Sequence, residues 1–169
     1  MILLGIDPGT ASTGYGVVDA TNPKSVISIE YGLIKTSKDL LMSERLLRIY
    51  ESSKELVRKY RPDAFIIESL FFNTNTKTAI TVGQARGIHI LVAGKYKVPV
   101  FEYTALQAKM VLTGYGRAEK SVVRNEVARR LNILTQIKPI DASDALAMAL
   151  CHVEKVLSPS TKQHEIKKT

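Results

Sequence analysis

Four acidic residues stand where a folded chain could gather them around metal ions. Asp7 and Glu68 each follow directly on a short apolar run, and Asp141 and Asp144 are three residues apart, so a helix would present both on one face. Four adjacent carboxylates repel one another at a partly buried site, and two divalent cations would relieve that repulsion. Mg²⁺ suits such a site because it binds few carboxylates, several waters and phosphate oxygens. The residue types therefore predict two-metal hydrolysis of a phosphodiester.

Each acidic residue also has a purely structural interpretation. Residues 7–9, Asp-Pro-Gly, are typical of a turn, and Glu68 could be a solvated charge at the end of a strand. Asp141 and Asp144 could be the N-cap of a helix and its N3 partner. Their joint occurrence favours the metal site, because the four residues fall at the ends of elements that a single crevice would need.

The elements that must position these residues follow from the hydrophobic pattern. Three runs with short connections, 2–6, 15–18 and 26–35, predict an antiparallel meander of strands. Apolar residues at helical spacing then predict a helix over 42–60, which the Arg61-Pro62-Asp63 sequence ends. The later pattern predicts strands at 64–68 and 98–103 and helices at 76–96, 104–112, 120–131 and 141–157.

This order of elements predicts an α/β domain with a five-stranded mixed sheet flanked by helices. The crossover through residues 42–60 should place the strand that ends in Glu68 parallel to, and beside, the strand that ends in Asp7. Ligands of open α/β sheets bind outside the carboxyl ends of the strands, so both residues would line one crevice.

Composition restricts the function classes. The chain has 169 residues, one ordinary domain, with 24 Lys and Arg against 16 Asp and Glu, a net charge of +8 that favours polyanionic partners. No apolar run reaches the roughly 18–20 residues of a membrane span, and the first residues do not resemble a signal peptide. The single Cys151 offers no intrachain disulfide, which fits a cytoplasmic protein. We expect one domain over 1–157 and a disordered polar tail over 158–169.

Basic residues are concentrated in the segment 104–140, which carries seven of them against two acidic residues. Such a segment could contact phosphates, although most charge runs form a solvated helix face. The basic residues are Lys109, Arg117, Lys120, Arg124, Arg129, Arg130 and Lys138.

Longer residue strings resemble one family. In chain order, they resemble motifs of the RuvC family of Holliday-junction resolvases over about residues 2–150. The matching strings are 5–10 (GIDPGT), 13–18 (TGYGVV), 67–71 (IESLF), 83–87 (GQARG), 99–103 (PVFEY), 114–121 (GYGRAEKS) and 141–147 (DASDALA).

The resemblance implies a ribonuclease H-like fold and a homodimer that acts in DNA recombination and repair. It implies Mg²⁺- or Mn²⁺-dependent, symmetric cutting of two opposed strands of a four-way DNA junction, leaving 5′-phosphate and 3′-hydroxyl nicks. It also implies cooperation with the RuvA–RuvB branch-migration complex. By motif position, Asp7, Glu68, Asp141 and Asp144 would be the metal-binding catalytic set.

The same resemblance implies roles in DNA binding. Lys109 and Lys120 match basic positions of the family, and Arg117 and Arg124 are further candidates. Phe71 matches an aromatic residue that the family inserts at the junction, although a phenylalanine is more often a core residue.

A four-way junction has approximate two-fold symmetry, so a C2 dimer would present one site to each of two strands. Ala79, Gly83 and Gly87 form a stripe of small residues that is a candidate interface, or that packs on the sheet of its own chain.

Three other functions remain open from the residues. An actin-like ATPase opens with a similar strand and turn, but it needs two such domains and this chain has room for one. A related ribonuclease H-like nuclease could act on RNA or other branched DNA. A non-catalytic DNA-binding module would keep DNA affinity without metal-dependent chemistry.

Overall fold

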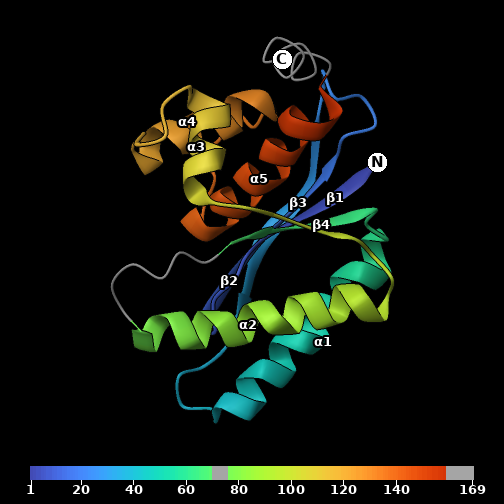
Figure 1. The fold of residues 1–169 in the computed structure, drawn as a ribbon, viewed down its shortest axis with the longest axis vertical. Helices are drawn as coiled ribbons and strands as arrows, with labels where there is room; N and C mark the ends of the chain where they lie inside the picture. The colour runs from blue at the N-terminus through green and yellow to red at the C-terminus, as the bar shows by residue number, and fades with distance from the viewer. Residues whose placement is uncertain (70–75, 159–169) are drawn as a thin grey trace, which may run out of the picture.

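The computed structural model describes residues 1–69 and 76–158. Figure 1 shows a central sheet with helices on both faces. In chain order the elements are β1 (Ile2–Asp7), β2 (Ser12–Asp19), β3 (Ile27–Lys35), α1 (Met42–Tyr60), β4 (Ala64–Glu68), α2 (Thr76–Lys95), β5 (Val100–Tyr103), α3 (Ala105–Thr113), α4 (Lys120–Arg130), α5 (Ile140–His152) and a π-helical turn, Val153–Leu157.

The sheet has the strand order β3-β2-β1-β4-β5. β1 pairs antiparallel with β2, and β2 with β3, which confirms the predicted meander. β4 pairs parallel with both β1 and β5, so the strand that ends in Glu68 does lie beside the strand that ends in Asp7. The mixed five-stranded sheet flanked by helices is therefore confirmed.

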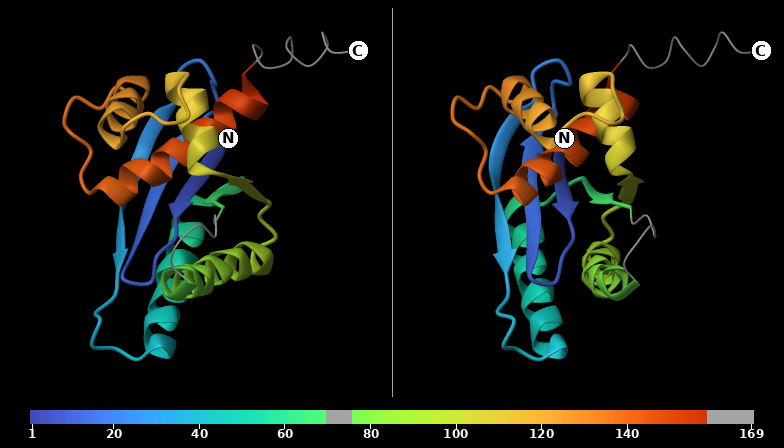
Figure 2. Two further views of the ribbon diagram at one scale, coloured as in Figure 1. Left: turned by 60° about the vertical axis from the view of Figure 1, so that its left-hand side comes forward. Right: turned by 90° about the vertical axis from the view of Figure 1, so that its left-hand side faces the viewer.

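Alternate residues of the central strands supply two separate cores. Leu3 and Ile66 are fully buried on the face that α3, α4 and α5 cover. Leu4, Phe65 and Ile67 are fully buried on the opposite face, against α1 and α2. The two helical layers are clear when the molecule is turned about its vertical axis (Figure 2). Strand residues buried on both faces explain why these runs are almost continuously apolar.

Helix α5 lies directly on the sheet because the strands beneath it carry glycine. A Cβ added at Gly5 would overlap the carbonyl oxygen of Ala145, and one added at Gly14 would overlap that of Asp141. At Gly16 it would overlap the side chain of Leu146. These glycines permit a close approach that any larger residue would prevent. The approach fixes the height of the first turns of α5 above β1 and β2.

Some boundaries differ from the predicted ones. The second strand begins at Ser12 rather than at Tyr15, because its glycines pair with β1. The last helix is α-helical only to His152, and a π-helical turn carries the chain to Leu157. No helix within the described residues is long and apolar enough to cross a membrane. Apart from Ser158, the predicted tail lies outside the described residues, so the division at residue 157 stays a prediction.

Candidate active site

The parallel register of β1 and β4 brings two carboxyl groups together. Ile6 pairs with Ile67, so the next residues, Asp7 and Glu68, end neighbouring strands at the same edge of the sheet. The turn after β1 is held by Thr13, whose hydroxyl donates to the carbonyl oxygen of Gly9 at 2.7 Å. Both acidic residues therefore lie at the carboxyl ends of parallel strands, as the sequence predicts.

Helix α5 brings the other two acidic residues to this edge, but their side chains differ in what they contact. Asp144 lines the same pocket as Asp7 and Glu68. Asp141 does not line it, and its Oδ2 instead accepts a hydrogen bond from the Ser12 hydroxyl at 2.8 Å. The alternative interpretation of the pair as a helix cap is wrong, because the N-cap is Pro139 and no side chain caps this end.

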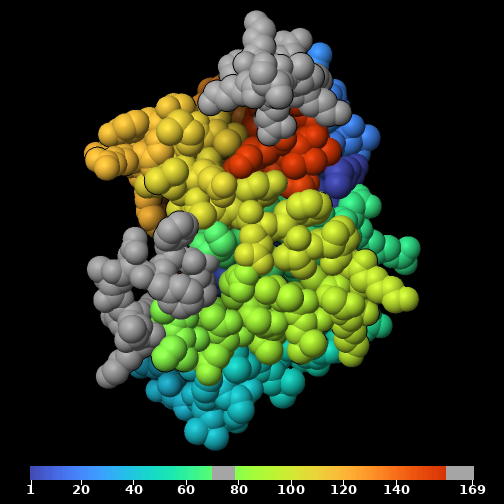
Figure 3. Space-filling view, viewed as in Figure 1, coloured from blue at the N-terminus to red at the C-terminus, as the bar shows by residue number. Residues whose placement is uncertain are grey.

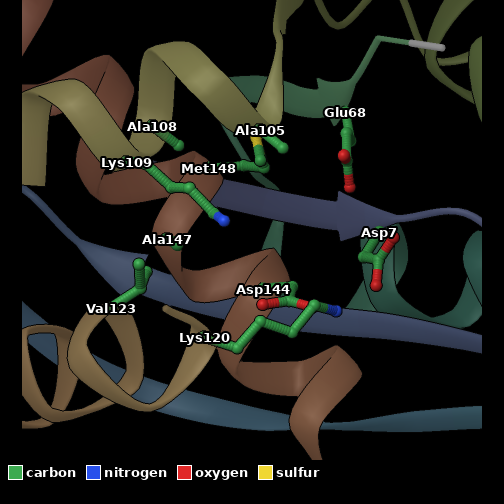
Figure 4. A pocket seen from close by; sticks show the side chains of 10 residues that line it. All are labelled: Asp7, Glu68, Ala105, Ala108, Lys109, Lys120, Val123, Asp144, Ala147 and Met148. Carbon is green, nitrogen blue, oxygen red and sulfur yellow. The ribbon is translucent and has the colours of Figure 1, made fainter. Parts of the chain in front are cut away.

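The pocket, about 180 Å³ in volume, also contains two basic side chains (Figure 4). Lys120, the first residue of α4, donates from Nζ to Asp144 Oδ2 at 3.0 Å. Lys109 extends into the pocket from α3. The rest of the wall is apolar and mostly of small residues, namely Ala105, Ala108, Val123, Ala147 and Met148. Carboxylate and ammonium groups in one pocket suit a substrate that carries phosphates and approaches a cation.

Burial sets the electrostatics of this site. Burial raises the pKa of Asp7 to about 8, and the negative charges of Glu68 and Asp144 add to the effect. Burial also raises the pKa of Glu68, although a hydrogen bond from Asp7 opposes that rise. The hydrogen bond to Asp144 and its negative charge raise the pKa of the Lys120 ammonium group. Burial and the neighbouring negative charges thus disfavour the ionised forms of both Asp7 and Glu68.

These residues fit a hard divalent cation. Within residues 1–69 and 76–158, no three Asp, Glu, His or Cys side chains are close enough to ligate one ion together. Mg²⁺ keeps several waters and needs only one or two carboxylates, which Asp7 and Glu68 offer. Both side chains offer carboxyl oxygens, the donor type that Mg²⁺ prefers, and both line the same pocket.

The residues predicted to bind DNA are distributed unevenly. Lys109 and Lys120 line the pocket. Arg117 is exposed in the loop before α4, whereas Arg124 is half-buried on α4 with an Nε that has no hydrogen-bond partner among the described residues. Phe71 lies outside the described residues.

The sequence interpretation missed two features of the site. Ser12 orients Asp141, and its position at the start of β2, opposite the first turn of α5, is a tertiary property that no local pattern shows. The alanines of the pocket wall are ordinary helix residues in sequence, and only the packing of α3 against α5 turns Ala108 and Ala147 toward the carboxylates.

Comparison with known proteins places this site in a family. The family model described as "Crossover junction endodeoxyribonuclease RuvC" matches residues 3–152. A protein of that description from Ruminiclostridium cellulolyticum is 49% identical over 152 residues, which are 90% of this chain and 91% of that one. Another from Caldicellulosiruptor saccharolyticus is 43% identical over 166 residues, 98% of this chain and 100% of that one.

Solved structures agree. The structure described as T. thermophilus RuvC in complex with Holliday junction substrate has a TM-score of 0.88 and 32% identity and covers 96% of each chain. The yeast mitochondrial Holliday junction resolvase Ydc2, 15% identical with a TM-score of 0.62, shares the fold. The ribonuclease H-like fold predicted from the motifs is thus confirmed. With its carboxylates at the ends of β1, β4 and α5, the chain belongs to the RuvC family of crossover junction endodeoxyribonucleases.

Proposed function

We propose that the protein resolves four-way DNA junctions by symmetric, metal-dependent hydrolysis of two opposed phosphodiesters, leaving 5′-phosphate and 3′-hydroxyl nicks. The observation that carries this function is the pocket in which carboxylates of β1, β4 and α5 face two lysines. The relatives named as crossover junction endodeoxyribonucleases and the neighbour bound to Holliday junction substrate support the substrate class.

Asp7, Glu68, Asp141 and Asp144 are the proposed metal ligands. The family is metal-dependent, and Mg²⁺, with Mn²⁺ as a substitute, is the cation we propose, two ions per site. When bound, such ions neutralise the carboxylates and the charge that develops on the phosphodiester. Ser12 fixes the orientation of Asp141 in the free protein, and Asp141 would have to leave that hydrogen bond or share its carboxylate to bind a cation.

The two lysines have separate tasks in this scheme. Lys120 pairs with Asp144 and so places a positive charge beside the carboxylates of the pocket. Lys109 carries an ammonium group into the same pocket and would bind a phosphate oxygen next to the cleaved bond. Arg117, Arg124 and Phe71 remain proposed DNA contacts outside the pocket.

A homodimer through α2 is proposed to supply the second site. Ile80 and Leu91 on the outer face of this helix are 64% and 58% exposed, and a Cβ added at Gly87 or Gly94 would meet nothing within 4 Å. An exposed glycine destabilises a helix, but it permits the backbone of a second helix to pack closely against it. Close packing by a partner would therefore explain why glycines stand at these positions. Of the stripe predicted from Ala79, Gly83 and Gly87, Gly87 is exposed and the other two are half-buried, so its role as an interface stays a prediction.

The space-filling view shows this helix lying across one face of the molecule, below α3 (Figure 3).

Two further properties stay predictions. A cytoplasmic location is predicted from the composition, and the RuvA–RuvB complex as a partner is predicted from the family resemblance.

One assay tests the proposed function. A synthetic mobile four-way junction and a linear duplex of the same sequence are incubated with the protein and Mg²⁺ or EDTA. We expect paired nicks that a ligase can seal, in the junction alone and only with Mg²⁺. Binding without cutting in both Mg²⁺ and Mn²⁺ would instead identify a non-catalytic junction-binding protein.

A further inference from the structure

A second hollow lies at the opposite end of the sheet, where α1 and α2 both end. It has a volume of about 420 Å³. Pro62 and Val98 in its wall precede β4 and β5, whereas Asp7 and Glu68 are the last residues of β1 and β4. The length of a six-residue strand, roughly 17 Å, therefore separates the hollow from the candidate active site. We call it the distal pocket; its lining residues are Val57, Arg58, Arg61, Pro62, Tyr96 and Val98.

The cations of the distal pocket are unpaired. Neither Arg58 nor Arg61 forms a side-chain hydrogen bond or ion pair with any residue of the described ranges. Lys97, between two residues of the wall, has no such partner in those ranges either. The acidic residue nearest in sequence, Asp63, already accepts the backbone N–H of Ile2 at 2.7 Å. The pocket thus presents two free guanidinium groups, and guanidinium binds carboxylates and phosphates strongly.

The backbone conformation of Arg61 bears on how its role can be tested. It ends α1 in the left-handed conformation, with φ of 46°, and Lys97 adopts φ of 56° after the end of α2. Glycine is the residue that most often occupies this conformation at a helix end, because a Cβ is disfavoured there. The helix dipole favours a cation at the same place, so a structural role competes with a binding role. The two roles predict different results for Arg61→Gly: a purely structural role predicts unchanged binding of an acidic ligand, and a binding role predicts weaker binding.

We propose that the distal pocket binds an acidic segment of a partner protein. Apolar side chains also line it: Val98 is half-buried and Tyr96 is exposed, and we call these two residues the floor of the distal pocket. A carboxylate can pair with the two arginines while a neighbouring apolar side chain of the same segment covers the floor. A DNA backbone offers the anion but has no apolar group for the floor. DNA held at the carboxylates would also have to cross the length of the sheet to reach the arginines.

NMR of the full-length ¹⁵N-labelled protein tests the assignment. The probe is an acetylated, amidated peptide of two aspartates, a leucine, a phenylalanine and two aspartates, titrated to millimolar concentration. Inorganic phosphate and a short DNA duplex are titrated separately. We expect the peptide to shift the amides of residues 57–62 and 96–98 more strongly than either other anion. Absence of these shifts, or equal shifts with duplex or phosphate, would overturn the assignment.

Three variants separate binding from folding. Arg61→Gly relieves the left-handed backbone and should keep the fold, yet it should weaken peptide binding about tenfold, as for one charge-assisted hydrogen bond. Arg58→Gln should do the same, and Arg48→Gln, an exposed arginine on the same helix but outside the pocket, should not. Peptide binding by Arg61→Gly as tight as that of the unaltered protein would leave Arg61 a structural helix end and overturn the inference.

The same variants distinguish this inference from the proposed function. Junction nicking by the isolated protein should be unchanged in Arg58→Gln and Arg61→Gly, because both residues lie at the other end of the sheet. Loss of nicking in either variant would show that the distal pocket serves the junction itself rather than a protein partner.

Discussion

Glycine is used in opposite ways by the two helical layers. Under α5, a Cβ at Gly5 or Gly14 would collide with the backbone of the helix. On α2, a Cβ at Gly87 or Gly94 would meet nothing within 4 Å. The first pair lets two parts of one chain touch, and the second pair leaves room that this chain does not fill.

This difference separates the chemistry of the molecule from its proposed assembly. The α5 layer carries two of the four carboxylates and, through α3 and α4, both lysines of the pocket. The α1–α2 layer contributes no residue to that pocket among those described. We therefore expect changes in the α5 layer to affect cutting first, and changes on α2 to affect association first.

The largest expected effect is on cutting. Asp7→Asn should reduce junction nicking at least about a thousandfold, because a metal ligand is worth several kcal/mol of transition-state stabilisation. The same variant should fold, and should be more stable than the unaltered protein without Mg²⁺, because it removes a buried carboxyl group beside Glu68. Gel assays of nicking and of junction binding check both parts. Normal nicking by this variant would remove Asp7 from the metal site.

Gly5→Ala should break the close approach of α5. The added Cβ would collide with the Ala145 carbonyl, and overpacking against a backbone should lower the free energy of unfolding by at least about 3 kcal/mol. Urea unfolding followed by circular dichroism measures the loss. If the variant were as stable as the unaltered protein, α5 could not pack as closely against Gly5 as the structure shows.

The α1–α2 layer should make the protein sensitive to acid. His89 on α2 is fully buried, accepts or donates one hydrogen bond with the Ser53 hydroxyl at 3.1 Å, and leaves Nε2 unpartnered among the described residues. Burial lowers its pKa to about 4, from 6.5 in an unfolded chain. The unfolded chain therefore binds the proton first, and the free energy of unfolding falls as pH drops from about 6.5 to 4, by up to about 3 kcal/mol.

Urea unfolding between about pH 7 and pH 4.5 tests this, with His89→Gln as the matched variant. The raised pKa of Asp7 acts in the opposite direction, since an acid that is protonated more readily in the folded state gains stability as pH falls. The difference between the two proteins isolates the histidine. Equal pH dependence in both would show that His89 does not titrate between folded and unfolded states.

The smallest expected effect is at Gly87. Alanine there meets open space in the single chain and should stabilise α2 by about 1 kcal/mol. It should also weaken the proposed dimer, raising its dissociation constant roughly tenfold, because a methyl group would separate the two backbones. Light scattering across a dilution series measures the second effect, and Leu91→Lys is a stronger version of the same change. A chain that is monomeric before any substitution would remove the α2 interface.

Much of this could be predicted from the sequence. The bounds of α1 and the break that begins at Arg61 are local features, set by spacing and side-chain chemistry, and the structure agrees with both. The adjacency of Asp7 and Glu68 followed from topology, because a single crossover leaves few ways to place β4.

The remainder depends on contacts between distant segments. The sequence places Asp141 and Asp144 on one face of a helix, but it does not reveal that Ser12 takes one carboxylate and Lys120 the other. For Ala79, Gly83 and Gly87, the sequence left open whether the stripe faces a partner or the sheet of its own chain, because small residues alone do not tell which side of a helix faces the sheet. The roles of the four carboxylates and of the DNA-binding residues stay proposals.

The packing of α5 on β1 and β2 determines the stage of folding at which the acidic residues come together. Ser12 and Asp141, which meet in the folded chain, are 129 positions apart. During synthesis the strands leave the ribosome long before the helix that completes the site exists. A nascent or locally unfolded chain therefore holds its acidic residues apart, and the capacity to break DNA arises only when the last helix docks.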